Sequence, residues 1–232
     1  MRGRGIMTEE LGKIERPAVE EFKKGRKLYF VPLILSVGDN DLELDLLIGK
    51  YWEQVEAQLV NLESKLGKVS SIFHELVPAD GENALKAIET ICKDSYKIVL
   101  NEIEKGAKLL SLEDGDILFE FMDWGRCLSI GIQSQKVFNE IYEAYNKAQK
   151  LRNETIARKI DEALVNDETG IIFLREGHYV QFPSDIQVFY VSPPGLDELK
   201  RWLRKKEAEA EKKMDKSSEV KNGEKSPGSS TP

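Results

Sequence analysis

Two histidines are the residues of this chain best suited to acid–base or metal chemistry, and each lies at the end of an apolar run typical of a strand. His74 belongs to SIFHELV and adjoins Glu75, while His178 follows GIIFLRE and lies two residues after Glu176. The carboxyl ends of parallel strands meet at one edge of a sheet, so we expect both histidines along the same edge. An imidazole with carboxylates is the composition of a metal site or of an acid–base pair.

His74, Glu75 and His178 are the predicted metal ligands, because two imidazoles need a carboxylate to complete a metal shell. A divalent metal is therefore the cofactor we expect if the protein needs one. Adjacent residues of a regular strand point to opposite faces, so only one of His74 and Glu75 can enter a given cleft. Glu176 and His178 are two apart and can share a face. In the alternative interpretation, His74 is a hydrogen-bonded core residue and His178 is a loop residue near the surface.

An arginine is the third predicted catalytic residue, beside Glu176 and His178. Arg152 lies in LRNE, within residues 133–166, whose apolar positions keep a helical period throughout. A guanidinium there can hold a carboxylate or another anion with two parallel hydrogen bonds. In the alternative interpretation, LRNE is only the solvated side of a helix. A second polar cluster, MDWGRC, has a helix end with a local ion pair as its simpler explanation.

The surrounding pattern predicts strands and helices in alternation. Strands are predicted at residues 27–36, 68–77, 170–174 and 186–191. Helices are predicted at residues 42–66 and 81–105, over residues 133–166 as one bent helix or two, and after Pro193 and Pro194. A shorter helix is predicted from a capping box at Ser111 to about residue 124, with a strand at ILFEF as the alternative. Pro32 cannot donate a hydrogen bond to a neighbouring strand, so it suggests an edge strand or a bulge.

This order predicts an α/β fold with a mostly parallel sheet of few strands, covered by long amphipathic helices. The unbroken apolar run after Gly170 is typical of a strand covered on both faces. Only about ten residues separate this run from the next one, which is short for a crossover helix. The last strand is therefore predicted to pair antiparallel or to follow a tight crossover.

Composition divides the chain into three parts. Residues 1–26 are polar without a sustained period and are predicted to be a flexible N-terminal arm. Residues 27–211 are predicted to form a single α/β domain. Residues 212–232 lose the apolar face, become rich in Ser, Gly, Pro and Lys, and are predicted to be a disordered tail.

Charge and hydropathy limit the classes of partner. The net charge is −7, but residues 200–216 carry eight Lys or Arg against four acids, which leaves −11 on residues 1–199. Nucleic-acid recognition needs a basic face, so this balance argues against it. The chain contains no apolar run long enough to span a membrane and no secretory signal, which predicts a cytoplasmic protein. The remaining partners are an unknown small molecule, a protein, or a second copy of the chain.

The familiar short motifs of nucleotide and hydrolase chemistry are missing from the sequence. GxGxxG, the P-loop, GxSxG and HExxH do not occur. Nucleotide binding and the serine or zinc-dependent hydrolase mechanisms that these motifs serve therefore lack support.

The run YNKAQKLRNETIARKIDEALVNDETGIIFLREGH resembles the C-terminal portion of the TraB/ChaN/erythromycin-esterase-like superfamily. In that superfamily a helix with an Arg-Asn or Arg-Asp pair precedes a strand ending in Gly-His, and an early strand ends in an acidic residue, as SIFHELV does here. The resemblance covers about a quarter of the chain. It implies a site made of Glu75, Arg152, Asn153, Gly177 and His178.

The family's opening Gly-Thr-x-His or Gly-Glu-x-His is absent, since LYFVPLILSVGDND contains no histidine. A member without that group would bind its ligand without turnover. Our first hypothesis is therefore a metal-assisted hydrolase of this type, degenerate or active. The second is a noncatalytic interaction protein whose helices at residues 42–66 and 196–211 contact a partner. The third, an RNA- or ribosome-associated factor, rests only on the basic stretch at residues 200–216.

Overall fold

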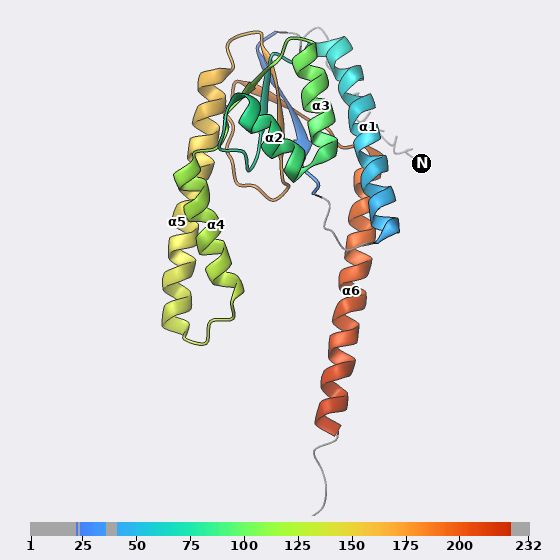
Figure 1. Cartoon of the computed structure of the whole chain (residues 1–232), viewed down its shortest axis with the longest axis vertical. Helices are drawn as coiled ribbons and strands as arrows, with labels where there is room; N and C mark the ends of the chain where they lie inside the picture. The colour runs from blue at the N-terminus through green and yellow to red at the C-terminus, as the bar shows by residue number, and fades with distance from the viewer. Residues whose placement is uncertain (1–21, 23, 36–40, 224–232) are drawn as a thin grey trace, which may run out of the picture.

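A computed structural model describes residues 22, 24–35 and 41–223, with the side chains of 213–223 excepted. Residues 1–21, 23, 36–40 and 224–232 lie outside the described part, and most of the predicted N-terminal arm is among them. The fold is α/β, as predicted, with one parallel sheet between helices (Figure 1). The strands are β1 (Arg26–Pro32), β2 (Ser71–His74), β3 (Lys108–Leu110), β4 (Thr169–Leu174) and β5 (Ile186–Tyr190). The helices are α1 (Leu42–Leu66), α2 (Gly81–Ile91), α3 (Lys93–Glu104), α4 (Gly115–Ser129), α5 (Gln135–Ala163) and α6 (Pro194–Gly223).

The strand order is β3-β2-β4-β1-β5, and every pairing within it is parallel. Strand β4 lies in the centre, between β1 and β2, and all six of its residues are buried. This explains its unbroken apolar run, because helices cover both of its faces. The prediction of an antiparallel last strand is wrong, whereas the tight crossover is confirmed. Strand β5 does not neighbour β4 but pairs in parallel with the far side of β1, so the short connection returns along the face of the sheet, where Val180 and Phe182 join the apolar cluster of Leu28 and Phe30.

Strand β1 is an inner strand, and the edge position suggested by Pro32 is wrong. Pro32 is the last residue of β1, pairs with Leu174, and lies where the ladder ends. A missing N–H is tolerated at that position. Its carbonyl oxygen accepts a 2.6 Å hydrogen bond from the Tyr51 hydroxyl, which ties the strand end to α1.

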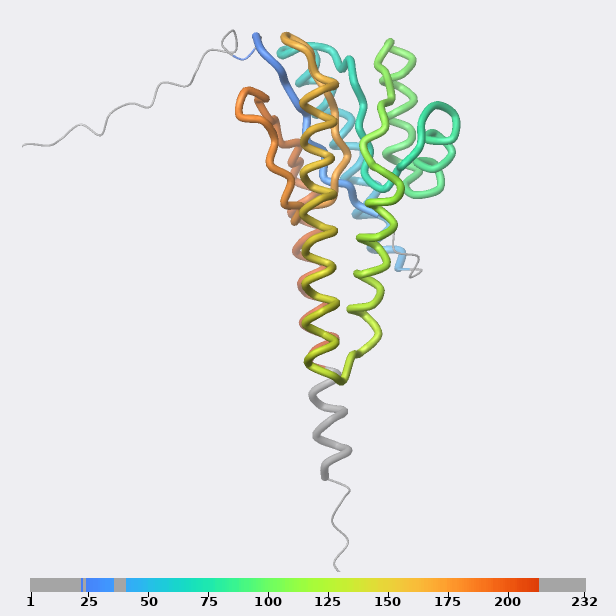
Figure 2. The backbone as a smooth tube through the Cα atoms, turned by 90° about the vertical axis from the view of Figure 1, so that its left-hand side faces the viewer, coloured from blue at the N-terminus to red at the C-terminus, as the bar shows by residue number. Residues whose placement is uncertain are grey.

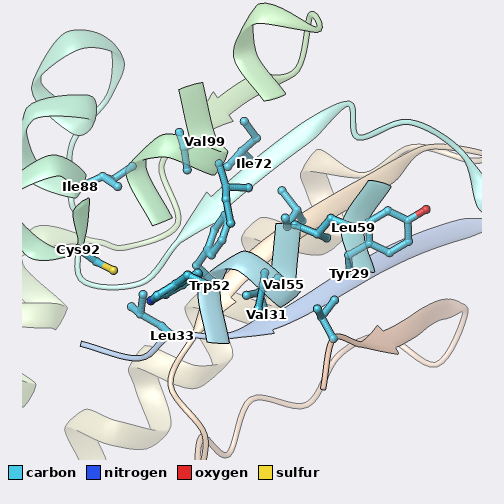
Figure 3. Packing of buried hydrophobic residues seen from close by; sticks show 14 of the residues in the cluster. Tyr29, Val31, Leu33, Trp52, Val55, Leu59, Ile72, Ile88, Cys92 and Val99 are labelled. Carbon is cyan, nitrogen blue, oxygen red and sulfur yellow. The ribbon is translucent and has the colours of Figure 1, made fainter. Parts of the chain in front are cut away.

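Two apolar clusters flank the sheet. On one face, α1, α2, α3 and α6 pack against alternate strand residues that include Tyr29 and Val31 (Figure 3). On the other face, Ile156 and Ile160 of α5 pack against Leu28 and other strand residues. Successive residues of a strand point to opposite faces, so each strand supplies both clusters. The face to which a strand residue points therefore decides which helices it contacts.

Several helix boundaries differ from those that the sequence pattern predicts. The predicted helix over residues 81–105 is two helices, because Cys92 has an extended backbone between α2 and α3 (φ −155°, ψ 99°). Helix α4 begins after Asp114, whose carboxylate accepts hydrogen bonds from the first-turn amides, and not at Ser111. Helix α5 is a single helix capped by Ser134, as expected.

The helices extend beyond the sheet. Helices α4 and α5 form an antiparallel hairpin that projects from it, and α6 projects in the same general direction (Figures 1 and 2). Helix α6 continues to Gly223, past residue 212 where the predicted tail begins. Residues 205–212, just before this point, are all Ala, Glu or Lys, which favour helix even without an apolar face. None of the helices in the described part of the chain is both long and apolar enough to cross a membrane.

Candidate anion-binding cleft

A buried network of arginine and glutamate lies at the carboxyl edge of the sheet. From α5, Arg152 donates through Nη2 to Glu75 Oε1 at 3.0 Å and through Nε to Glu113 Oε2 at 3.1 Å, and Nη2 also contacts Glu113 Oε1. These three side chains are at most 7% exposed. Charges at such depth are tolerated only when they are paired and hydrogen-bonded. The alternative in which LRNE is merely solvated therefore fails for Arg152.

Glu75 is held by a second arginine. Its Oε2 accepts from the backbone N–H of Arg175 at 2.7 Å, and the Arg175 guanidinium donates to both carboxylate oxygens at 3.0–3.2 Å. Burial alone would raise the pKa of Glu75, but hydrogen bonds and charge from Arg175 and the charge of Arg152 outweigh it and lower that pKa. Glu75 is thus an ionised structural carboxylate and a poor general base.

The turn after β2 fixes this network. The backbone N–H of Glu75 still donates to Phe173 of β4, and the chain then turns at Leu76, which has the rare positive φ of 67°. The Leu76 N–H donates to Glu113 Oε1 at 3.1 Å, and Lys159 of α5 donates to the Glu113 carbonyl oxygen at 2.7 Å. Hydrogen bonds to β4 and to Glu113, which is itself held by α5, therefore stabilise this strained turn.

His178 lies at the same edge, just after the turn at Gly177 (φ +79°). Its ring packs on Phe30, with centroids 5.0 Å apart, and its Nδ1 accepts a 3.2 Å hydrogen bond from the Val180 N–H. Burial lowers the pKa of His178, and the charge of Glu75 opposes this only in part. The ring is therefore neutral near pH 7, with its proton on Nε2, because Nδ1 is the acceptor.

His74 does not join the site, so the predicted grouping of His74, Glu75 and His178 is wrong. Its ring is 1% exposed, lies against Phe173, and has Nδ1 2.7 Å from the Glu75 carbonyl oxygen and Nε2 3.0 Å from Ser95 Oγ. Burial lowers its pKa to about 4. The physical reason is that successive residues of a strand point to opposite faces of the sheet, and His74 points to the face covered by α3. The alternative of a hydrogen-bonded core histidine is the one observed.

The residues present do not fit the divalent metal that the sequence suggested. Both nitrogens of His74 are engaged within the core, and the oxygens of Glu75 already face two guanidinium groups. In the described part of the chain, no group of three His, Cys, Asp or Glu side chains is arranged to hold a metal. The cations that contact the Glu75 carboxylate are the two arginines, Arg152 and Arg175.

Glu176, the other predicted catalytic carboxylate, is also engaged. Lys200 of α6 donates to its Oε1 at 2.7 Å, and the Tyr190 hydroxyl contacts the same oxygen. Burial, with a further contribution from Glu176, raises the pKa of Tyr190. Glu176 thus links the end of β4 to β5 and α6 through one of its two carboxylate oxygens.

A cleft of about 520 Å³ opens above this network, between α4, α5 and the segment after β4. All five positions that the family resemblance indicated line it. Three arginines and two glutamates line it, and Glu113 and Asp123 pair with Arg152 and Arg126 from just outside the lining. Nine lining side chains carry N–H or O–H donors: Arg126, Ser129, Tyr145, Gln149, Arg152, Asn153, Arg175, His178 and Tyr179.

The sequence analysis gave no role in the site to three residues that the structure places there. Glu113 follows the three-residue strand β3 and meets Arg152 only in the folded chain, so no local signal marks it. Arg175 is the first residue of REGH, and its place directly after a buried strand was a usable signal. Arg126 was visible in MDWGRC, and it does pair with Asp123 at 2.6 Å, but it also lines the cleft.

Comparison of the chain with known family models, with curated proteins and with solved structures finds no match. The chemistry of the cleft is therefore the basis for a functional proposal.

Proposed function

We propose that the protein binds a small anionic molecule in this donor-lined cleft, without a metal. One observation carries the proposal: Glu75 and Glu176, the carboxylates of the cleft, already accept hydrogen bonds from arginine, tyrosine or lysine. The guanidinium of Arg175 and the ring of His178 thus keep N–H hydrogens that these carboxylates do not use. An anion supplies the missing acceptors, and charge-assisted hydrogen bonds are about twice as strong as neutral ones.

Arg175 and His178 are the expected contacts. Arg175 uses Nε and Nη2 on Glu75, and its side chain is 45% exposed, so further guanidinium hydrogens face solvent. His178 is neutral and carries its hydrogen on Nε2. Glu75, itself held by Arg152, anchors the Arg175 guanidinium, which means that little side-chain freedom is lost on binding.

The family resemblance supports the same proposal. The five positions that the resemblance indicated come from three separate parts of the chain, at residues 75, 152–153 and 177–178, yet they line one cleft. The missing first histidine motif and the poor fit to a metal favour a member that binds its ligand over one that uses metal-assisted turnover.

Calorimetric titration of the full chain with acetate, succinate and inorganic phosphate tests the proposal. Arg126→Gln should weaken binding about tenfold, since it removes a charged donor from the cleft. Arg158→Gln is the matched control, because Arg158 is also an exposed helical arginine with an acidic partner, Glu162, but does not line the cleft. Absence of binding by all three anions in the millimolar range, or equal loss in both variants, would overturn the proposal.

Hydrolysis of an ester in the same cleft is our second candidate, and the neutral state of His178 favours it. An Nε2–H can donate to a carbonyl oxygen and polarise it for attack by water, after which the C–O bond breaks and the alcohol leaves with a proton from that water. Release of nitrophenol from 4-nitrophenyl acetate tests this step. Equal rates for the wild type and His178→Ala, with both proteins folded, would remove the hydrolase and leave the binding protein.

A further inference from the structure

The cleft continues along α5 into a second hollow of about 470 Å³. Gln149, Asn153 and Tyr179 line both spaces. A third hollow of about 490 Å³ shares Gln149 and Tyr179 with them, and Asn146 with the second. The three spaces therefore form one groove between α5 and the segment that follows β4. Its extent exceeds what a single small anion can fill.

The second hollow differs in chemistry from the cleft. Its lining contains four carboxamides, which are Asn146, Gln149, Asn153 and Gln181. The first three follow one another at spacings of three and four, so they form a ladder on one face of α5 that is about 10 Å long. Lys150 and Glu154, the charged residues of this lining, lie 3.8 Å apart as an ion pair, so the hollow has no net charge.

Carboxamides suit ligand groups that both donate and accept hydrogen bonds. Each offers an N–H₂ donor and a carbonyl acceptor, and a hydroxyl offers the same combination. Phosphate oxygens or carboxylates would use only the donors. The second hollow is therefore suited to an uncharged, hydroxyl-bearing part of a ligand.

Tyr179 lies where the three hollows meet. Its side chain is 68% exposed, while both neighbours are anchored, His178 by its contact with Phe30 and Val180 by burial in the apolar cluster. An exposed ring held in place from both sides offers an apolar face and a hydroxyl to a ligand. A sugar ring has complementary parts, with C–H groups on its face and hydroxyls at its rim.

We infer that the ligand is a sugar that carries a carboxylate or phosphate group. This inference rests on the proposed anion binding. The anionic group occupies the cleft beside Arg175 and His178, and the sugar ring lies in the second hollow against Tyr179 and the carboxamide ladder. The division of the groove into a part lined by arginine and histidine and a part lined by carboxamides is the juxtaposition that carries it.

Calorimetric titration of the full chain with glucuronate and glucose 6-phosphate, compared with acetate, inorganic phosphate and glucose, tests the inference. At least one anionic sugar should bind about tenfold more tightly than its anion alone. Asn146→Ala and Gln181→Ala, which touch only the hollows outside the cleft, should each weaken sugar binding about threefold to tenfold and leave acetate and phosphate unaffected. Asn139→Ala, on the same helix but outside the groove, should change neither.

The outcomes separate this inference from the proposed function. Acetate or phosphate binding as tightly as both sugars overturns the sugar and leaves the anion site intact. Absence of binding by every anion overturns both. Tighter binding of tetraalanine than of either sugar makes the ligand a peptide and also overturns the inference.

Discussion

Replacing Arg152 by methionine tests the buried network that supports the cleft. Arg152 makes one hydrogen bond to Glu75 and two to Glu113, and the side chains of both glutamates are at most 3% exposed. Glu75 keeps Arg175 as a partner in the variant, so Glu113 is the carboxylate left without a cation. Removing one partner from a buried ion pair typically costs about 3–5 kcal/mol of unfolding free energy.

For a chain of this size, such a loss corresponds to a fall in Tm of roughly 6–20 °C. Urea unfolding followed by circular dichroism measures the free energy, and a thermal melt measures the Tm. The double variant Arg152→Met with Glu113→Gln should recover part of the loss, because the uncompensated charge is gone. Arg158→Gln, the exposed control, should cost less than about 0.5 kcal/mol. A loss for Arg152→Met no larger than the control's would refute the network as described.

Two further predictions concern the core. His74 has a pKa of about 4 in the folded chain, against an ordinary value of 6.5. As the pH falls, the unfolded chain therefore binds a proton at His74 before the folded chain does. About 3 kcal/mol of unfolding free energy should be lost between pH 6.5 and pH 4. His74→Gln should flatten that part of the stability–pH curve, and an unchanged slope would contradict the assignment. Gly170→Ala should lower the free energy of unfolding in urea by about 1–3 kcal/mol, because the added Cβ would lie 3.1 Å from side-chain atoms of Leu28, Phe73 and Leu164. An unchanged free energy would mean that these side chains move aside without cost.

Local pattern was sufficient for the fold class and for most elements. Apolar residues at spacings of three and four marked the long helices, an unbroken apolar run marked the central strand, and the alternation of strand and helix implied a parallel sheet. The three-residue strand β3 was missed because it is too short to show a period. The break at Cys92 was missed because the apolar face of α2 continues into α3 with little change in spacing.

The composition of the site was harder to predict than its place. Alternation along β2 showed that His74 and Glu75 face opposite ways, but not which of them faces the cleft. That depends on which helices cover each face of the sheet, a tertiary property. For the same reason Arg152 was expected to hold a ligand, whereas its partners are the protein's own glutamates.

Imidazole NMR tests the anion-binding cleft most directly, because the chain contains only two histidines and they occupy opposite environments. The ring signals of the full chain would be followed during titration with succinate, acetate and inorganic phosphate. The proposed function predicts saturable shifts of the His178 signals with at least one anion, an unprotonated Nδ1 at neutral pH, and no change at His74. Unchanged His178 signals with all three anions, or equal shifts at both rings, would contradict it.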